Sequence, residues 1–401
     1  MRIVSARFAT TLHGKILSGR FKRLAATAAV AALLLFSSLS PDRAASATAP
    51  ANSSPAPTCA TCHAGVAASY AHAAMQHALL TPDANPVLEE HPNLTVKIGN
   101  YSYTVETRNG QSAYTVSDGI GSITLPIHWI FGRHSQTWVL ERDGVFYESQ
   151  VSFFRRDQAL ATTPGHANIV PHSLAEAIGR RTSHAELLKC FNCHSTDATE
   201  GARLTLDKLS PGLSCERCHE GAGRHMTDAI HDNFTTLPRS LKAMNAEDTA
   251  NFCGQCHRTW DTAIRNHWHG PADVRFQPYR LMNSQCFLGS DPRISCTACH
   301  DPHKPVETNL ASYDAKCMAC HGVARKSDPK KPDPKKPDLA KSDAPDSDAA
   351  SSVPASIVKT CTVAKANCAS CHMPKIELPE GHAAFTDHEI RVVRPNEPYP
   401  D

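Results

Sequence analysis

The pentapeptide Cys215-Glu216-Arg217-Cys218-His219, with Cys190-Phe191-Asn192-Cys193-His194 shortly before it, decides how this chain folds and what it binds. Both segments read C-x-x-C-H, the pattern of covalent c-type haem attachment, in which two thiols add to the haem vinyl groups and the next histidine reaches the iron. Five further copies lie at Cys59/Cys62/His63, Cys253/Cys256/His257, Cys296/Cys299/His300, Cys317/Cys320/His321 and Cys368/Cys371/His372.

We number these copies motifs 1 to 7 in chain order. Their cysteines are the predicted attachment points of seven haem c groups, and their histidines are predicted iron ligands. Zinc is the alternative, because C-x-x-C pairs also build tetrahedral thiolate sites, but zinc pairs have no reason to be followed each time by histidine. Cys286 and Cys361 lie outside the motifs. In an oxidising compartment they form a disulfide, or each is a buried thiol or an iron ligand.

The composition predicts an unconventional core. Aromatic residues make up only 6% of the chain, proline accounts for 28 residues, and 14 of the 16 cysteines belong to the motifs. Seven macrocycles would supply the apolar surface that aromatic side chains usually give. We therefore expect a mainly α fold with long loops, organised around covalently bound haems, with a small antiparallel β insertion after motif 1. The chain without haem is expected to fold poorly.

Residues 1–47 have the composition of a signal peptide. A basic leader precedes the apolar run from Leu24 to Leu39, and Ala45-Ser46-Ala47 has the small residues of a cleavage site. The alternative is a membrane anchor, although the run is shorter than the roughly 20 residues of a usual spanning helix. Cleavage near Ala47 would release a periplasmic protein, which suits haem attachment outside the cytoplasm.

The charge balance argues against a nucleic-acid partner. The formal net charge is +2, but residues 1–47 contribute seven Lys/Arg and one Asp, a net +6, so the remainder is at +2 − 6 = −4. No basic footprint for phosphate binding remains. The expected partners are redox proteins in the periplasm or at the membrane.

The remaining sequence divides by local pattern. Asn109-Gly110, Asp118-Gly119 and Asp143-Gly144 separate β-branched and aromatic runs, which is typical of hairpins. Ser173–Lys189 is expected to be one helix, capped by Ser173 with Glu176 behind it. The predicted segments are a flexible tether (48–57), a first haem segment (58–93), the β insertion (94–160), a multihaem region (161–324), a disordered Pro-rich charged linker (325–359), and a seventh haem segment with the C-terminal tail (360–401).

Each haem iron has two axial positions, and the motif histidine fills one. A second histidine leaves no place for substrate, whereas an open face permits small-molecule chemistry. Of 23 histidines, seven are in motifs and one, His13, is in the leader, so fifteen remain for seven distal positions. The supply permits full bis-histidine ligation without requiring it.

Several segments resemble the multihaem cytochrome c-552/c-554-like family. They are Cys190 to Thr196, Cys215 to His225, Ser295 to His303, Cys371 to Lys375 and Asp387 to Arg391. The resemblance covers roughly residues 59–391. It implies that His225, His303 and His388 are distal ligands, each to a haem other than the one attached nearby. His77 and His134 are further candidates by the same resemblance.

Three functions follow from these patterns. The leading hypothesis is a periplasmic heptahaem cytochrome that carries electrons through closely packed haems. The alternative is a multihaem oxidoreductase with one open-faced haem acting on a small nitrogen or sulfur compound, with no catalytic residue identifiable from the sequence. The third is a structural or docking subunit whose haems serve mainly folding.

Overall fold

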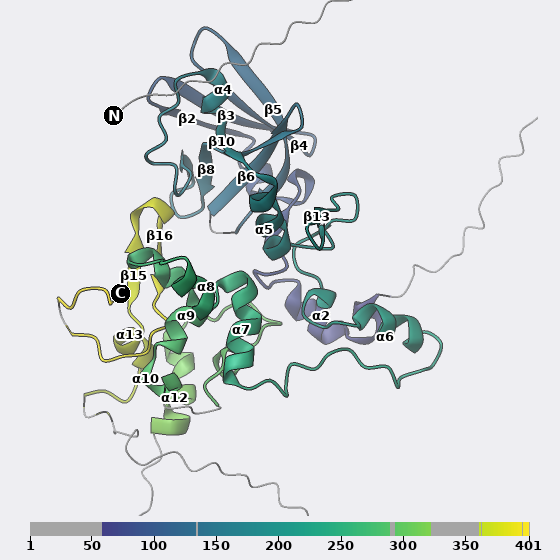
Figure 1. Cartoon of the computed structure of the whole chain (residues 1–401), viewed down its shortest axis with the longest axis vertical. Helices are drawn as coiled ribbons and strands as arrows, with labels where there is room; N and C mark the ends of the chain where they lie inside the picture. The colour runs from purple at the N-terminus through teal and green to yellow at the C-terminus, as the bar shows by residue number, and fades with distance from the viewer. Residues whose placement is uncertain are drawn as a thin grey trace, which may run out of the picture. The chain divides into compact units, whose positions relative to one another are not determined.

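The computed structural model describes residues 58–133, 135–288, 293–321, 361, 363–394 and 396–400, all within one compact unit, Ala56–Asp401. Its largest element is a ten-stranded sheet with the order β10-β7-β6-β5-β4-β3-β2, in which β1 pairs with β5, and β8 pairs with β6 and β9 (Figure 1). All pairings are antiparallel. The strands are β1 (Leu79–Leu80), β2 (Asn93–Ile98), β3 (Tyr101–Arg108), β4 (Gln111–Ser117), β5 (Ser122–Phe131), β6 (Ser135–Arg142), β7 (Val145–Ser149), β8 (Val151–Phe154), β9 (Ala159–Thr162) and β10 (Gly179–Thr182).

The hairpin turns lie where their residues predict them. Arg108 pairs with Gln111 across a two-residue turn in which Asn109 and Gly110 have φ of 52° and 74°. Asp143 and Gly144 form the same kind of turn between β6 and β7, with φ of 53° and 74°. Left-handed backbone at both central positions matches the twist of the flanking strands, and Asn-Gly and Asp-Gly tolerate it best.

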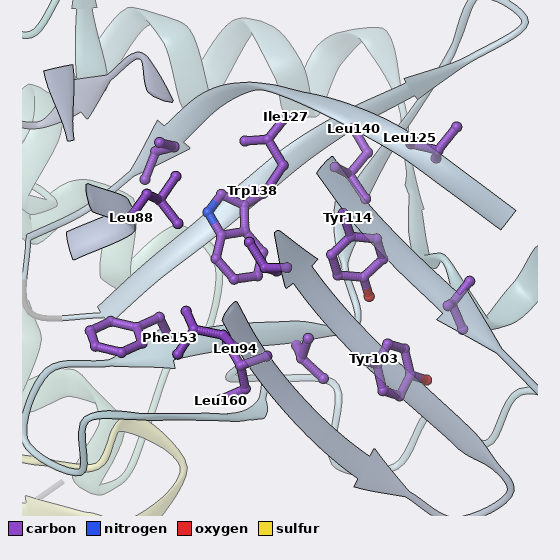
Figure 2. Packing of buried hydrophobic residues seen from close by; sticks show 14 of the residues in the cluster. Leu88, Leu94, Tyr103, Tyr114, Leu125, Ile127, Trp138, Leu140, Phe153 and Leu160 are labelled. Atoms are coloured by element: carbon purple, nitrogen blue, oxygen red, sulfur yellow. The ribbon is translucent and has the colours of Figure 1, made fainter. Parts of the chain in front are cut away.

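The sheet has a conventional hydrophobic core. Alternate residues of neighbouring strands point to the same side, so that Tyr103 pairs with Val116 and Val105 with Tyr114, all fully buried. Trp138 of β6 is also fully buried, with its ring centroid 6.0 Å from that of Tyr114. Figure 2 shows these aromatic side chains gathered with the leucines of the neighbouring strands. This core contains no motif residue.

The prediction of a mainly α fold with a small β insertion is therefore wrong. The strands run from β1 at Leu79 to β10 at Thr182, well beyond the expected 94–160. The error came from treating the whole chain as short of core-forming side chains. Ten of the 25 aromatic residues lie on the strands of this sheet, where β-branched and aromatic side chains pack well on a pleated surface.

The single helix expected over Ser173–Lys189 is also wrong. Ser173 caps α4 (Leu174–Ala177) by accepting a hydrogen bond from the Glu176 amide, as expected, but the helix ends there. Residues Gly179–Thr182 form β10, which pairs with β7. A second cap, Ser183 with Glu186, then starts α5 (His184–His194), which carries motif 2. Sheet pairing overrides the helical pattern between the two caps.

Helix α5 attaches motif 2 to the sheet. Phe191, inside the motif, is fully buried and makes edge-on ring contacts at 5.3 Å with both Trp129 and Phe131 of β5. Leu187, one turn earlier, joins the same cluster with Leu79. The aromatic residue between the two cysteines therefore packs on the sheet, and neither cysteine belongs to this hydrophobic cluster.

Beyond residue 195 the structure consists of short helices and three two-stranded sheets. In Figure 1 the green helices α7, α8 and α9 lie together, and contacts join α7 to α9 and α8 to α9. The strands are β11 (Ser195–Thr196), β12 (Thr199–Glu200), β13 (Arg203–Leu204), β14 (Ser210–Pro211), β15 (Lys375–Leu378) and β16 (Ala383–Thr386). The helices are α6 (Ala222–Ala229), α7 (Ala246–His257), α8 (Trp260–Arg265), α9 (Gln277–Met282), α10 (Gln285–Leu288), α11 (Cys296–Cys299), α12 (Asp314–His321) and α13 (Cys368–His372).

This second region has almost no core of its own. Among its described residues, the large apolar side chains that are buried are Leu213, Val274 and Tyr279, and the other buried apolar residues are alanines. Large apolar side chains are instead exposed, namely Ile230, Phe234, Leu237, Trp260, Ile264, Leu288, Val306, Met318, Val363 and Val392. Exposed apolar surface on this scale indicates a missing apolar partner.

Several predicted features fall outside the described residues. They are the signal peptide 1–47, the tether 48–57, the linker 325–359, the candidate ligand His134 and the side chain of Cys320. Within the residues that are described, no helix has both the length and the apolar character needed to cross a membrane.

Candidate functional site

Each motif places its two cysteines on one helical turn. Residues three apart on a helix lie on the same face, so both thiols can reach one planar group. The turns are α1 (Cys59–Cys62), the end of α5, the 3-10 turn Cys215–Arg217 with Cys218 after it, the end of α7, α11, the end of α12, and α13. Local structure therefore suits the two thioether bonds that the pattern predicts.

Three motif histidines are held in the tautomer that binds iron. The Nδ1 atoms of His194, His219 and His372 lie 2.8, 3.3 and 2.8 Å from the backbone carbonyl oxygens of Ala78, Arg239 and Arg391. A carbonyl oxygen only accepts, so each ring must donate from Nδ1. The lone pair is then on Nε2, free for a metal, and the hydrogen bond fixes the ring orientation.

Among the described residues, no such carbonyl contact is found for the other four motif histidines, and for two of these four neither a ring contact nor a side-chain hydrogen bond is found. His63 of motif 1 ends α1 and precedes α2 (Ala64–Tyr70), and its backbone amide donates to the Cys59 carbonyl oxygen at 2.9 Å. Its ring is exposed, and so is that of His321 at the end of α12. Within the described part of the chain, neither ring has a hydrogen bond or a contact with a second histidine. The prediction that His63 and His321 ligate iron therefore rests on the motif alone.

In motif 6 the structure describes one of the two thiols. The backbone of Cys320 belongs to α12, but its side chain lies outside the described part of the structure. Only Cys317 shows where a thiol of this motif lies, and it is part-exposed. The predicted thioether at Cys320 therefore stays a prediction from the spacing of the motif.

Two motif histidines and one candidate distal histidine are held in the uncharged form. Loss of solvation lowers the pKa of His194 and His300, and it lowers the pKa of His388 to about 4. All three rings are neutral at pH 7. A neutral imidazole is the form that ligates a metal.

The structure brings two candidate distal histidines against motif histidines far away in sequence. The ring centroids of His219 (motif 3) and His303 are 5.9 Å apart, with an interplanar angle of 6°. Those of His300 (motif 5) and His388 are 6.2 Å apart, at 40°. A separation of roughly 6 Å would leave room for one metal ion held by a nitrogen of each ring at about 2 Å.

The other candidates differ from these two. His225 on α6 donates from Nδ1 to the carbonyl of Thr236 at 2.6 Å, so its Nε2 carries the lone pair, but no ring contact with another histidine is found among the described residues. His77 has the opposite arrangement, because its Nε2 lies 2.8 Å from the carbonyl oxygen of Ala71. That hydrogen bond occupies the nitrogen that the other candidates leave free.

Thiols of different motifs lie against one another. The thiols are close enough to shift one another's pKa: Cys59 raises the pKa of Cys215, Cys256 that of Cys193, Cys296 that of Cys253, and Cys368 that of Cys317. Cys218 interacts electrostatically with Cys253 and Cys256, and Cys299 with Cys317. Six links therefore join all seven motifs: 1 to 3, 3 to 4, 2 to 4, 4 to 5, 5 to 6 and 6 to 7. Motif 4 is the branch point.

A charged cluster lies beside motif 2. Glu148 accepts hydrogen bonds from Arg180 at 2.9 Å and from the buried His166 at 3.2 Å. Burial alone would raise the pKa of Glu148, but these two donors outweigh burial and lower it. The same carboxylate is close enough to add to the effect of burial on Cys190, whose pKa rises to about 11. A thiol with this pKa stays protonated at pH 7.

The residues fit haem better than zinc. Among the described residues, no group of three or more His, Cys, Asp or Glu is arranged to hold a metal ion, so the cysteine pairs do not converge on tetrahedral sites. The described motif thiols are part-exposed or exposed, and the region that holds motifs 3 to 7 also exposes large apolar side chains. A large apolar group that carries its own metal satisfies both observations.

Sequence reasoning missed a buried ion-pair cluster. Arg280 of α9 is 1% exposed and pairs with Asp387, which is 0% exposed and immediately precedes His388. Burial alone would raise the pKa of Asp387, but hydrogen bonds from Arg280 lower it overall. Nothing near Arg280 in the sequence signals this pair, because its partners lie in the C-terminal segment.

Comparison with known proteins gives one match. Residues 148–220 match the family described as "Cytochrome c554 and c-prime". The matched segment includes motifs 2 and 3 and the strands β8, β9 and β10 that precede them. No curated protein and no solved structure matches the chain. The match supports a c-type cytochrome with covalently bound haem and iron that takes part in electron transfer.

Proposed function

We propose that this chain is an exported, periplasmic heptahaem c-type cytochrome that passes electrons between redox partner proteins. The observation that carries the proposal is the set of six links by which the motif cysteines form one connected network. Attachment points in contact require neighbouring macrocycles. Haem supplies reversible one-electron exchange at its iron, and transfer between haems falls steeply with distance.

The network has a defined route. The proposed electron route follows these links from motif 1 through 3, 4, 5 and 6 to motif 7, with motif 2 beside motif 4 and, through the hydrogen bond from Arg217 to Asn192, beside motif 3. Motif 2 is also the motif packed on the sheet through Phe191. The sheet therefore holds motif 2, and motifs 1 and 7, at the two ends of the route, are proposed as the places where partners exchange electrons.

The motif histidines are proposed as one axial ligand of each iron. His303 is proposed as the second ligand of the haem at motif 3, and His388 as that of the haem at motif 5. Their support is the centroid separations of 5.9 and 6.2 Å from His219 and His300. His225 is proposed as a third distal ligand because its Nε2 is free. His77 and His134 stay predictions.

Cutting the network at motif 4 tests the function. Cys253→Ala/Cys256→Ala removes both attachment points at the branch, whereas Cys368→Ala/Cys371→Ala removes only the terminal motif 7 and serves as the control. A pulse of reductant first delivers less than one electron per molecule. In the wild type and the control, these electrons should then redistribute among the haems at a rate independent of protein concentration. In the motif 4 variant, part of the redistribution should require electron transfer between colliding molecules, so its rate should rise with protein concentration.

A concentration-independent rate in the motif 4 variant, equal to that of the wild type, would contradict the route. Electron paramagnetic resonance of the oxidised wild type distinguishes an electron carrier from the alternative, a multihaem enzyme. Only low-spin signals agree with a carrier, whereas a high-spin haem that binds nitrite, nitric oxide or carbon monoxide would favour catalysis.

A further inference from the structure

The segment Thr386–Arg391 lies between two candidate haem sites. His388 stands 6.2 Å, centroid to centroid, from His300 of motif 5. The carbonyl oxygen of Arg391, three residues later, accepts the Nδ1 hydrogen bond of His372 of motif 7 at 2.8 Å. One short segment therefore presents a ring to one site and orients the ring of another.

A buried arginine holds this segment from the side. The Nε and Nη2 atoms of Arg280 donate to Oδ1 and Oδ2 of Asp387 at 2.9 and 3.0 Å, a bidentate pair. Nη2 is also 2.6 Å from Oε2 of Glu389. Arg280 and Asp387 are 1% and 0% exposed, so both charges depend on these partners.

The same contacts fix the backbone on both sides of His388. A carboxylate oxygen of Asp387 accepts from the Glu389 amide at 3.0 Å, closing a turn around His388. The Ser284 hydroxyl, two residues after α9, donates to the His388 carbonyl at 3.2 Å and accepts from the Ile390 amide at 2.8 Å. Arg280 on α9 and Ser284 just after it therefore contact four consecutive residues, Asp387 to Ile390.

The far end of the segment belongs to the same cluster. Nη1 of Arg391 donates to Oδ2 of Asp387 at 2.5 Å, which ties the acceptor of His372 to the carboxylate beside His388. The Arg280 guanidinium lies 4.6 Å from the Tyr399 ring centroid and donates to the carbonyl of Pro400 at 3.2 Å. Two arginines and two acids balance in charge, and Arg280 contacts both acids.

We propose that Arg280 is a positioning residue for two haem irons, holding Thr386–Arg391 so that His388 reaches the iron at motif 5 while Arg391 orients His372 at motif 7. This inference rests on the proposed function, since it requires haem at both motifs. The guanidinium suits the role because its planar fork fixes the direction of Asp387, which a point charge does not do.

Replacing Arg280 should alter two haems and leave the others unchanged. In Arg280→Met, the haem at motif 5 should lose its low-spin signal and show one equivalent of high-spin signal. The haem at motif 7 should shift to a higher reduction potential, because a histidine that no longer donates from Nδ1 is a weaker ligand for oxidised iron. Arg280→Lys, which keeps the charge without the fork, should show a partial loss at motif 5.

Arg280→Met leaves Asp387 buried without its main partner, so folding itself can fail. Arg280→Met/Asp387→Asn removes both charges, leaves the opposite charges of Glu389 and Arg391 in balance, and should show the same two altered haems. Arg265→Met removes an arginine whose ion pair with Asp261 on α8 is exposed, and it should alter no haem.

Haem content by intact mass, potentiometric titration and paramagnetic resonance of the holoprotein decide the outcome. Seven haems with two altered supports the proposal. Unchanged spectra and potentials in the double variant, or equal changes at all haems, would overturn it. A wild type that lacks seven haems or low-spin bis-histidine signals instead rejects the proposed function, and the inference with it.

Discussion

At the residue scale, the choice of ring nitrogen separates the histidines. His219 and His388 donate from Nδ1 to backbone carbonyls and keep Nε2 free, whereas His77 uses Nε2. A sequence gives residue types but not which nitrogen meets an acceptor. The motif histidines could be predicted from C-x-x-C-H alone. The carbonyls that orient them could not, because Ala78 and Arg239 carry no signature.

The pairing of His303 with His219 gives a prediction at this scale. His303→Ala should remove one distal ligand, so one haem equivalent should change from low-spin to high-spin and bind carbon monoxide. The absorbance and paramagnetic resonance spectra of the oxidised and reduced protein measure this. His269→Ala is the control, because His269 is exposed and no ring contact with a motif histidine is found for it among the described residues. A fully low-spin His303→Ala protein would contradict the pairing.

At the element scale, strand pairing determines a secondary structure that the local sequence pattern does not predict. Both caps of the segment Ser173–His194 were visible in sequence terms, since Ser173 and Ser183 are each followed three residues later by a glutamate. Nothing local indicates that Gly179–Thr182 joins β7. The sheet was underestimated for a similar reason, because whole-chain composition hid a region with ordinary core side chains.

The cap of α5 gives a pH prediction. The Ser183 amide and then Arg180 lower the pKa of Glu186 from 4.5 to about 2. A depressed carboxyl pKa stabilises the folded state above the unfolded pKa, and that contribution is lost as pH falls from about 4.5 towards 2. Glu186→Gln should therefore lower the melting temperature at pH 7, and the difference from wild type should shrink to nothing near pH 2.

Thermal melts of both proteins from pH 7 to pH 2 measure this difference. Glu200→Gln on the exposed strand β12 is the matched control, with a smaller effect at every pH. A Glu186→Gln difference that is constant with pH would show that the charge of the cap contributes nothing.

The sheet predicts partial folding without haem. Its core of side chains such as Tyr114 and Trp138 includes no motif residue, whereas the region beyond residue 195 buries few large apolar groups. Without haem, the full chain should keep a protease-resistant fragment near residues 79–194 and be cleaved at motifs 3 to 7. Limited proteolysis with mass spectrometry tests this, with the haem-loaded chain as control. Uniform cleavage of the apo chain would contradict it.

At the scale of the whole molecule, the motif network is what the sequence could not give. Seven motifs could be read from the sequence, with a haem predicted at each, but their neighbours could not, because motif 3 lies beside motifs 1 and 4 as well as beside motif 2, whose Asn192 carbonyl accepts a hydrogen bond from Arg217. The cytochrome family match spans residues 148–220, where the sheet meets motifs 2 and 3. Folding brings the other attachment points to these two.

Every statement about conduction depends on haem at each repeated pentapeptide. The most direct measurement is the intact mass of the purified, exported protein under denaturing conditions, which thioether-bound haem survives. The account predicts the mass of the processed polypeptide plus seven haems. A mass equal to that of the bare polypeptide, or one with haem missing at the linking motif 4, would contradict it.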